Sequence, residues 1–398
     1  MSRSEPRRVI GLIVNPMAGI GGSVGLAGSD GTEIQAEALA RGGAPRAPDR
    51  AKRFVEELLR RVPDVLLLTG HRALGGDSAP AGARVEILGA DPSEPLNVSA
   101  DADLPARTAD AEVPTSADDT VRLARRLAAS GVEVLVFVGG DGTARDVLRG
   151  LAPGFTDQLC VGVPGGVKMH SGVFAVTPED AAAQIGEVLS SVGTARDARS
   201  ELRDVVDLDE EARRQGFLHT EVYGALRVPL HARMQRGKRS PMQGAASVDG
   251  AGIAAALRTQ HTGALVFGPG TTVTEVAHHC GVDATLLGFD VLLPGGEVLH
   301  DVTGTELERL ADSHDLGVVL SPIGGQGFLI GRGNHQLTER VLESLSPEQL
   351  FVVSGYEKLG ELAGKLRIDA PTIALNAKFR GYRRVLLGPV DSAIVSLE

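Results

Sequence analysis

The sequence of 398 residues contains no tryptophan, two cysteines and 3 % aromatic residues. Proteins that bind single-stranded nucleic acid by stacking need aromatic side chains, so this composition disfavours that class. Two isolated thiols, Cys160 and Cys280, without CxxC spacing favour a reducing compartment over a disulfide framework. No stretch approaches the about 20 apolar residues of a membrane helix, and the start of the chain does not resemble a signal peptide. We therefore expect a soluble, cytoplasmic protein with no membrane partner.

The charge balance is acidic, with a formal net charge of −11 at pH 7. This charge disfavours nucleic acid as a partner, and a phosphate-bearing substrate would need local cations or Mg²⁺. Hydrophobic residues make up 42 % and charged residues 23 %, as in ordinary globular proteins. The length is sufficient for two domains with substantial cores.

The run VLVFVGGDGTARDVL at residues 134–148 is the most informative part of the sequence. Its apolar residues predict a buried parallel strand, and the residues after the glycines predict a helix. A glycine turn at a helix N-terminus presents backbone N–H groups that bind phosphate. Asp141 in this turn would repel phosphate unless it serves a metal or a proton transfer. We therefore predict a kinase in which Asp141 acts chemically, and an ordinary βα turn or hairpin is the alternative interpretation.

Strands and helices alternate along the first half of the chain, which predicts an α/β layer with a mainly parallel sheet. Ligands of such sheets bind beyond the carboxyl ends of the strands, where Asn15, Asp141 and Gly165 are expected. Ser116 with Asp119 predicts a capping box for a helix that runs to residue 129. We expect strands at 9–14, 65–68, 85–88, 134–138 and 160–163, helices at 49–61 and from 178, and a loop at 89–115.

The pattern changes near residue 196, where a second, β-rich domain is expected to begin. The predicted domains are thus residues 1–195 and 196–398, with the C-terminal segment a candidate to pack back on the first domain. Strands are predicted near 205 and at 222–230, 264–267, 286–293, 317–320 and 351–354, and helices at 209–215, 248–260 and 273–280. Gly268-Pro269-Gly270-Thr271-Thr272 follows one of these strands and precedes a helix, which indicates a second phosphate site.

These motifs resemble the NAD kinase (ATP-NAD kinase) family, which forms one superfamily with diacylglycerol and sphingosine kinases. Gly-Gly-Asp-Gly-Thr at 139–143 resembles the family motif, and Asn-Pro-Met-Ala-Gly at 15–19 resembles the turn after the first strand of that superfamily. Segments at 163–175, 268–272 and 321–334 resemble the branch that contains the acetoin-catabolism X protein.

The resemblance implies an α/β N-terminal domain, a β-rich C-terminal domain and a homo-oligomer. It implies transfer of a phosphoryl group to the adenosine ribose 2′-hydroxyl of NAD, giving NADP, with Mg²⁺ and with ATP or polyphosphate as donor. Asp141 would be the catalytic general base. No residue is assigned as a metal ligand. The residues expected to bind cofactor are Asn15, Gly139, Gly140, Gly142, Thr143, Gly165, Gly166, Lys168, Gly270, Thr271, Thr272 and Arg332.

Lys168 and Arg332 are the cations in this set, and a lysine suits the role of a point charge beside phosphate. His170 and Ser171 are candidates to hydrogen-bond the ribose or the substrate. Asp146 is a candidate to orient Lys168 or to help bind a metal, and its alternative role is to complement the helix dipole.

Two features depart from the family pattern. The Asn-Glu pair that holds the dinucleotide in mainstream NAD kinases has no counterpart here, and residues 21–115 are expanded. Two alternatives therefore stay open: a kinase of another nucleotide-like or lipid acceptor, and a sensor that binds NAD or ATP without turnover. Asp141 favours turnover, whereas the missing pair favours the sensor.

Overall fold

The computed structural model describes residues 8–21, 24, 32–88, 115–165, 169, 171–190, 198–208, 220–230 and 248–398. The chain divides into two compact units, of which Met1–Gly19 and Pro45–Gly237 form the first and Ile20–Ala44 and Lys238–Glu398 the second. The division falls later than the predicted domain boundary at 195–196, so the strands between residues 200 and 229 belong to the first unit. The predicted helix at 209–215 and most of the predicted loop at 89–115 lie outside the described residues.

The first unit is built on a parallel sheet of five strands in the order β3-β2-β1-β4-β5. This confirms the predicted α/β layer with a mainly parallel sheet. The strands are β1 (Val9–Val14), β2 (Leu66–Gly70), β3 (Val85–Leu88), β4 (Val134–Gly139) and β5 (Cys160–Pro164).

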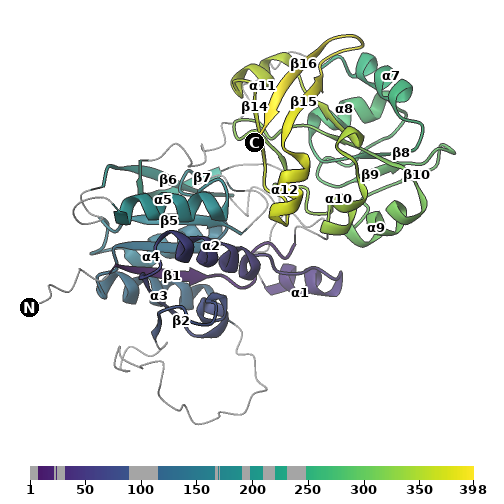
Figure 1. Cartoon of the computed structure of the whole chain (residues 1–398). Coiled ribbons are helices and arrows are strands. Elements are labelled where there is room, and N and C mark those ends of the chain that lie inside the picture. The colour runs from purple at the N-terminus through teal and green to yellow at the C-terminus, as the bar shows by residue number, and fades with distance from the viewer. Residues whose placement is uncertain are drawn as a thin grey trace, which may run out of the picture. The chain divides into compact units, whose positions relative to one another are not determined.

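Helices cover both faces of this sheet (Figure 1), which is why its strands are apolar without alternation. On one face Leu12 and Val136 share a core with Phe54, and on the other Ile13 and Phe137 share a core with helix residues such as Leu127. The first face carries α2 (Ala47–Arg61) and α5 (Pro178–Ser190), and the second carries α3 (Ala117–Ala129) and α4 (Asp141–Leu151). Two short 3₁₀ helices, η2 (Arg72–Leu74) and η3 (Gly76–Ser78), follow β2.

Capping residues set the starts of two of these helices, as the sequence predicts. The Ser116 hydroxyl accepts a hydrogen bond from the Asp119 N–H, and the Ser116 N–H donates to the Asp119 carboxylate at 2.8 Å. The Asp180 N–H donates to the Thr177 hydroxyl at 3.0 Å at the start of α5. Each bond satisfies an N–H group that has no partner within its helix.

A two-stranded antiparallel ribbon, β6 (Ser200–Leu208) and β7 (Thr220–Pro229), completes the first unit. Its Val205, Leu226 and Val228 join the core that α3 and α4 form with the sheet. The register of the ribbon shifts between Val205 and Val206, opposite Gly224. The ribbon therefore packs on the helix that follows the Gly-Gly-Asp-Gly-Thr motif.

The second unit contains a sheet of nine strands in the order β10-β9-β8-β11-β13-β15-β16-β14-β12. Neighbours among β8, β11, β13 and β15 pair in parallel, whereas β9 and β16 pair antiparallel with β8 and β15. The strands are β8 (Ala264–Phe267), β9 (Asp290–Leu292), β10 (Val298–Leu299), β11 (Leu316–Leu320), β12 (Phe328–Ile330), β13 (Leu350–Val353), β14 (Lys365–Ile368), β15 (Gly381–Leu386) and β16 (Ser392–Leu397). The strand-rich C-terminal region is confirmed.

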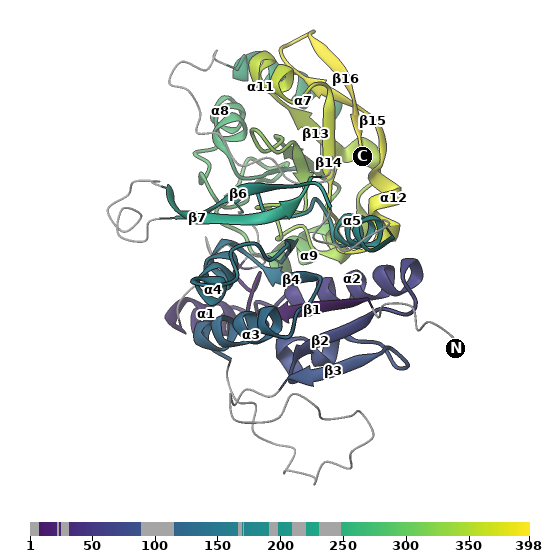
Figure 2. The same cartoon turned by 90° about the vertical axis from the view of Figure 1, so that its left-hand side faces the viewer.

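Helices also lie on the central sheet of the second unit (Figure 2), and several of them were not predicted. Phe267, Val319 and Val353 share a core with α7 and α8, and Val266, Val318 and Val352, one residue earlier on each strand, join the core with α9, α10 and α12. The helices of the second unit after residue 248 are α7 (Gly250–Gln260), α8 (Thr271–His279), α9 (Gly304–Ser313), α10 (Glu339–Ser344), α11 (Tyr356–Glu361), α12 (Ile373–Phe379) and the 3₁₀ helix η5 (Pro347–Gln349). The segment Ile20–Ala44, which contains α1 (Thr32–Ala40), is also assigned to this unit.

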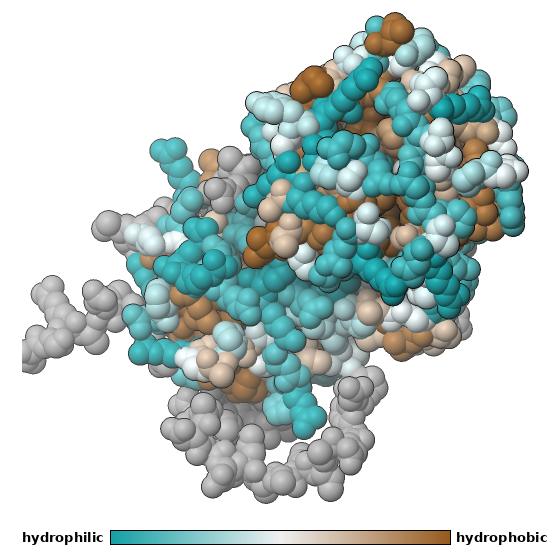
Figure 3. Space-filling view, turned by 45° about the vertical axis from the view of Figure 1, so that its right-hand side comes forward, coloured by the Kyte–Doolittle hydropathy of each residue, from teal (hydrophilic) through white to brown (hydrophobic). Residues whose placement is uncertain are grey.

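Hydrophilic side chains dominate the face shown in Figure 3, and hydrophobic residues appear there in small groups. Among the described residues, no helix combines the length and the apolar composition needed to cross a membrane.

Candidate active site

The turns after β1 and β4 meet where the strand order of the first sheet reverses. From β1 the chain proceeds to β2 and β3 on one side, and β4 and β5 lie on the other. The Asn15 N–H donates to the Val138 carbonyl at 3.0 Å, and the Asn15 side-chain amide donates to the Thr143 hydroxyl at 2.9 Å. Ligands of open α/β sheets bind at such a reversal, beyond the carboxyl ends of the strands.

Asp141 is the first residue of α4 and lies within this turn. Its side chain is buried, with 6 % of the residue exposed, and its Oδ1 accepts a hydrogen bond from the Ser171 N–H at 3.0 Å. Gly140 occupies the cap position and offers no side-chain hydrogen bond to the helix. The first turn of α4 therefore presents N–H groups and a buried carboxylate at one place, as phosphoryl transfer with a general base requires.

The glycines around the turn differ in why they lack a side chain. A Cβ on Gly139 would lie 2.2 Å from the Thr143 Oγ1, and one on Gly19 would lie 2.3 Å from the Gly165 carbonyl. A Cβ on Gly165 would meet the backbone of Gly139 at 3.1 Å. These three glycines are needed for packing. Gly140 has an ordinary extended backbone and open space around its Cβ position, so packing does not require a glycine there.

Two of the predicted cofactor-binding residues serve to hold the turns together. Thr143 is buried, and its hydroxyl accepts the hydrogen bond from Asn15. The Asn15 Oδ1 accepts from the Met17 N–H at 3.1 Å. Asn15 thus joins the β1 turn to the β4 turn, and its contact with a cofactor stays a prediction. Gly142 lies in the first turn of α4, next to Asp141.

The loop after β5 is described in part, and it contributes Ser171. Gly166, Lys168 and His170 lie outside the described residues. The Ser171 hydroxyl donates to the Val206 carbonyl and accepts from the Val206 N–H, both at 2.9 Å. The sequence offered no signal for this use of the hydroxyl, because the partner comes from a strand 35 residues later.

Asp146 lies in α4, five positions after Asp141, and is also buried. Arg149 approaches its carboxylate at 3.4 Å and also lies 3.6 Å from Asp118. Asp146 therefore contributes to charge pairing along α4, and its predicted relation to Lys168 stays a prediction.

The second predicted phosphate turn has the expected strand–turn–helix form. It follows β8 and leads directly into α8, which begins at Thr271. Gly270 has φ +116°, a conformation that favours glycine, and its N–H donates to the Leu286 carbonyl at 2.9 Å. Thr271 and Thr272 form the first turn of α8, where no side chain caps the helix. The turn belongs to the second unit, so its part in one site with Asp141 stays a prediction.

Arg332 lies in the interior of the second unit. Its Nη2 is 3.2 Å from the Asp369 Oδ2, and both side chains are at most 1 % exposed. Its guanidinium carbon lies 4.7 Å from the centre of the Phe328 ring. Five strands stand between β8 and β12 in the sheet order, so the sheet does not place Arg332 beside the Gly270 turn. The structure thus gives Arg332 a role in the core, and contact with phosphate stays a prediction.

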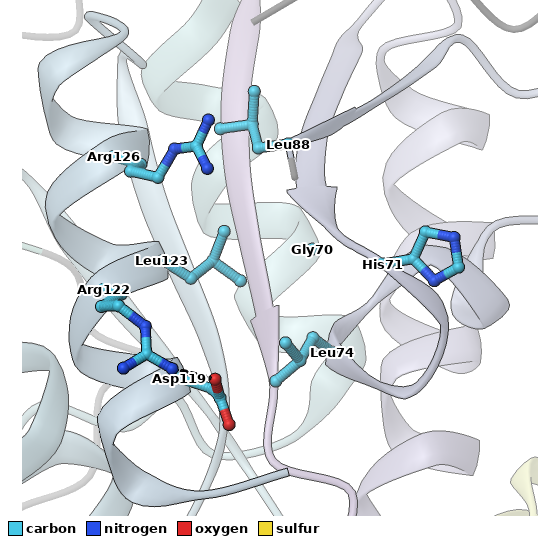
Figure 4. Close-up of a pocket in the computed structure, with 8 residues that line it drawn as sticks. All are labelled: Gly70, His71, Leu74, Leu88, Asp119, Arg122, Leu123 and Arg126. Carbon is cyan, nitrogen blue, oxygen red and sulfur yellow. Dashed lines mark hydrogen bonds and ion pairs between the residues drawn. The ribbon is translucent and has the colours of Figure 1, made fainter. Parts of the chain in front are cut away.

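A small depression lies at the carboxyl ends of β2 and β3 beside α3 (Figure 4). Leu74, Leu88 and Leu123 line it, and Arg122 and Arg126 lie one helical turn apart at its rim. Arg122 is paired with Asp119. The residues that line it include none of the turns after β1 and β4, so we assign it no substrate.

Among the residues that the structure describes, we assign no further site to the cysteines and histidines. Burial raises the pKa of the Cys160 thiol far above its ordinary value, which makes it a poor nucleophile. Within the ranges that the structure describes, no three His, Cys, Asp or Glu side chains come close enough together to hold a metal ion.

Two parts of the chain match models of a known protein family. Residues 10–192 match the ATP-NAD kinase N-terminal domain, and residues 263–397 match the ATP-NAD kinase C-terminal domain. No curated protein matches the chain. A solved structure provisionally described as a diacylglycerol kinase from Bacillus anthracis str. Sterne is similar at 15 % identity and a TM-score of 0.24, over 55 % of this chain and 64 % of that one. That TM-score is too low to inform the fold or the function. Placement in the acetoin-catabolism branch stays a prediction. Since the two matched domains together span most of the sequence, the chain belongs to the ATP-NAD kinase family.

Proposed function

We propose that the chain is an ATP-dependent NAD kinase, which transfers the γ-phosphoryl group of ATP to the adenosine ribose 2′-hydroxyl of NAD and releases NADP and ADP. The observation that carries the proposal is the buried Asp141 carboxylate in the first turn of α4, at the reversal of the strand order. Membership of the family supplies the choice of NAD as acceptor.

Asp141 would act as the general base. As the ribose oxygen attacks the γ-phosphorus, its proton passes to the Asp141 carboxylate, and the bond from the γ-phosphorus to the bridging oxygen of ADP breaks. General-base assistance of this kind contributes about 10²- to 10⁴-fold to a rate. The hydrogen bond from the Ser171 N–H fixes one carboxylate oxygen, so the group is oriented before the substrate arrives.

The donor phosphates would lie over Gly140. The open space at its Cβ position is explained if a ligand occupies it, because neither packing nor backbone conformation requires glycine there. The N–H groups of Gly140, Gly142 and Thr143 would bind phosphate oxygens, and the helix dipole of α4 favours their negative charge. Lys168 is the proposed cation of this site.

Mg²⁺ would arrive with the ATP phosphates. Protein sites for Mg²⁺ commonly use one or two carboxylates together with water and substrate phosphates. We therefore propose an ion that the nucleotide phosphates and water hold for the most part. When bound, it would neutralise charge on the phosphates; we assign no residue of the chain to it.

The sensor is the second candidate function, because the Asn-Glu pair of mainstream NAD kinases is missing. In a protein that only bound the nucleotide, a carboxylate beside phosphate would weaken binding through charge repulsion. The presence of Asp141 therefore favours a catalytic role over the sensor. A different nucleotide-like or lipid acceptor is the other alternative. A cytoplasmic location and a homo-oligomeric state stay predictions.

The test is NADP formation by the purified full chain with Mg²⁺, ATP and NAD, measured with an NADP-specific dehydrogenase. We expect Asp141→Asn to lower kcat by about 10²-fold or more, in line with general-base catalysis. Asp64→Asn is the matched control, because Asp64 is 88 % exposed and lies in the same unit. Parallel assays replace ATP with polyphosphate, and NADP as acceptor should give no product because its 2′-oxygen is already phosphorylated.

Each other outcome favours a different function. Nucleotide binding without product from either donor would support the sensor. ATP consumption with another acceptor but not with NAD would support the alternative kinase. Wild-type activity retained in Asp141→Asn would contradict the role of Asp141 while leaving the acceptor assignment intact.

A further inference from the structure

Ser171 connects the Asp141 carboxylate to the β6–β7 ribbon. The residue is completely buried, and its polar groups have partners on both sides. Its N–H donates to the Asp141 Oδ1 at 3.0 Å, while its hydroxyl both donates to and accepts from the backbone of Val206 at 2.9 Å. Ser171 is therefore fixed by hydrogen bonds to β6, and it fixes the Asp141 carboxylate in turn.

The outer edge of β6 explains why a hydroxyl is needed here. The ribbon has two strands, so the edge of β6 that faces away from β7 has backbone groups without a strand partner. At Val206 both the N–H and the carbonyl bond to the Ser171 hydroxyl, and the Gly172 N–H donates to the Asp204 carbonyl at 3.2 Å. Ser171 thus pairs with β6 as a neighbouring strand would.

A second connection holds the same ribbon to α4. Asp207, the next residue of β6, is buried, and its Oδ2 lies 3.0 Å from the Arg145 Nη1. Arg145 follows Asp141 by about one helical turn, and its guanidinium lies 5.4 Å from the centre of the Tyr223 ring on β7. A Cβ on Gly224 would lie 2.9 Å from Leu148, so the ribbon also packs closely on this helix.

We propose that Ser171 is a positioning residue for Asp141, and that it transmits the position of the β6–β7 ribbon to the catalytic carboxylate. It acts through Asp141 and does not itself bind the ribose, because its hydroxyl is engaged with Val206. The kinetic part of the proposal rests on the proposed kinase function. The structural part, which is the coupling of ribbon and carboxylate, does not.

The kinetic test is a double-mutant cycle of Ser171→Ala and Asp141→Asn. Misplacement of a reacting group by about 1 Å can cost about 10²-fold, so we expect Ser171→Ala to lower kcat by about tenfold or more with KM nearly unchanged. In the Asp141→Asn background, Ser171→Ala should cause no further loss, because the group that it positions is already inactive. A structural role alone would give losses that multiply, and that result would overturn the proposal.

Ser200→Ala is the matched control. Ser200 lies on the same strand, and its hydroxyl accepts from Arg227 at 3.4 Å instead of contacting the Asp141 turn. We expect its kcat to equal that of the wild type in both backgrounds. If Ser171→Ala does not fold, Ser171→Cys keeps a similar volume with a weak donor, and the same cycle is measured with it.

Amide hydrogen exchange of the full chain without substrate separates the two parts of the proposal. Ser171→Ala should speed exchange in peptides covering residues 203–207 and also in those covering 139–147, whereas Ser200→Ala should leave the second group unchanged. Faster exchange in 203–207 alone would overturn the coupling. If the wild type forms no NADP, the proposed kinase function fails, and this measurement still decides whether Ser171 joins the ribbon to the Asp141 turn.

Discussion

The turns after β4 and β8 have similar sequences, yet their surroundings differ. The first lies at a reversal of the strand order, where Asn15 of a neighbouring turn donates to Thr143. The second follows a strand that lies between parallel β11 and antiparallel β9, and its Gly270 bonds to Leu286. The first turn contains Asp141, whereas the second contains no acidic residue.

The nearest strand to the second turn does carry a buried carboxylate, but it is fully used. Asp290 on β9 pairs with Phe267 of β8, and its two oxygens accept hydrogen bonds from Thr285, His300 and Asp301. A glycine turn at a helix start thus supplies N–H donors, whereas proton transfer also needs a carboxylate held for that purpose. We therefore propose that the second turn binds an anion and that the first also takes part in the reaction.

Replacement of Arg332 by Met would have the largest effect on stability that this comparison predicts. Breaking a buried ion pair leaves Asp369 charged and without its guanidinium, which typically costs about 3–5 kcal/mol. Denaturant unfolding of the purified variant measures this loss. At temperatures where the variant remains folded, we expect KM for ATP and NAD to stay within about twofold. KM rises when a substrate contact present in both the ground state and the transition state is lost, and a role of Arg332 in the core alone would not provide such a contact.

Arg340→Met is the control for Arg332→Met. Arg340 pairs with Asp312 at 2.8 Å, but both side chains are more than half exposed, so its loss should cost no more than about 1 kcal/mol. A large rise in KM for ATP in Arg332→Met, without loss of stability, would instead support the prediction that Arg332 binds phosphate.

Substitutions of the adjacent glycines Gly139 and Gly140 distinguish the effect of packing from that of ligand binding in the first turn. Gly139→Ala would press a Cβ against Thr143 and should destabilise the fold by about 1–3 kcal/mol. Gly140→Ala has open space, so it should cost only about 1 kcal/mol, from loss of a residue favoured at the N-cap of α4, while weakening ATP binding. Thermal unfolding and ATP titration of both variants give the two readouts. Unchanged ATP affinity in a folded Gly140→Ala variant would place the phosphates elsewhere.

Local patterns predicted much of this fold. Strands 9–14, 85–88 and 264–267 have the predicted bounds. In 9–14 and 264–267 the signal is a continuous apolar run, as expected for buried strands covered on both faces. The capping box at Ser116 and the start of α5 follow from residues that lie three positions apart. These features depend on neighbours in the chain, which a sequence displays directly.

The features that sequence reasoning missed depend on distant partners. The hydrogen bonds between the Ser171 hydroxyl and the Val206 backbone join residues 35 positions apart. The ion pair between Arg332 and Asp369 joins residues 37 positions apart. An arginine between two glycines looks the same in sequence whether it meets a phosphate or a buried carboxylate. The sequence pattern at 200–229 indicates the start of a second domain, whereas the structure places this ribbon in the first unit. The ribbon packs on α4 through tertiary contacts, which the sequence does not display.

A small effect is also predicted for the capping box at the start of α9. Thr303→Ala should lower the free energy of unfolding by about 1 kcal/mol, as loss of an N-cap does, without changing activity. The N–H and hydroxyl of Thr303 lower the pKa of Glu306 below its ordinary value of 4.5. Because the pKa is lower in the folded state, this stabilisation is present above the unfolded pKa and is lost as pH falls through the folded one. The stability difference between the wild type and Glu306→Gln should therefore shrink between about pH 7 and about pH 3. A difference that stays the same at the lower pH would show that the Glu306 charge does not contribute to the cap.

Ser116→Ala is the matching variant in the first unit, because Ser116 and Asp119 form the same kind of capping box. We expect a similar loss of about 1 kcal/mol in denaturant unfolding.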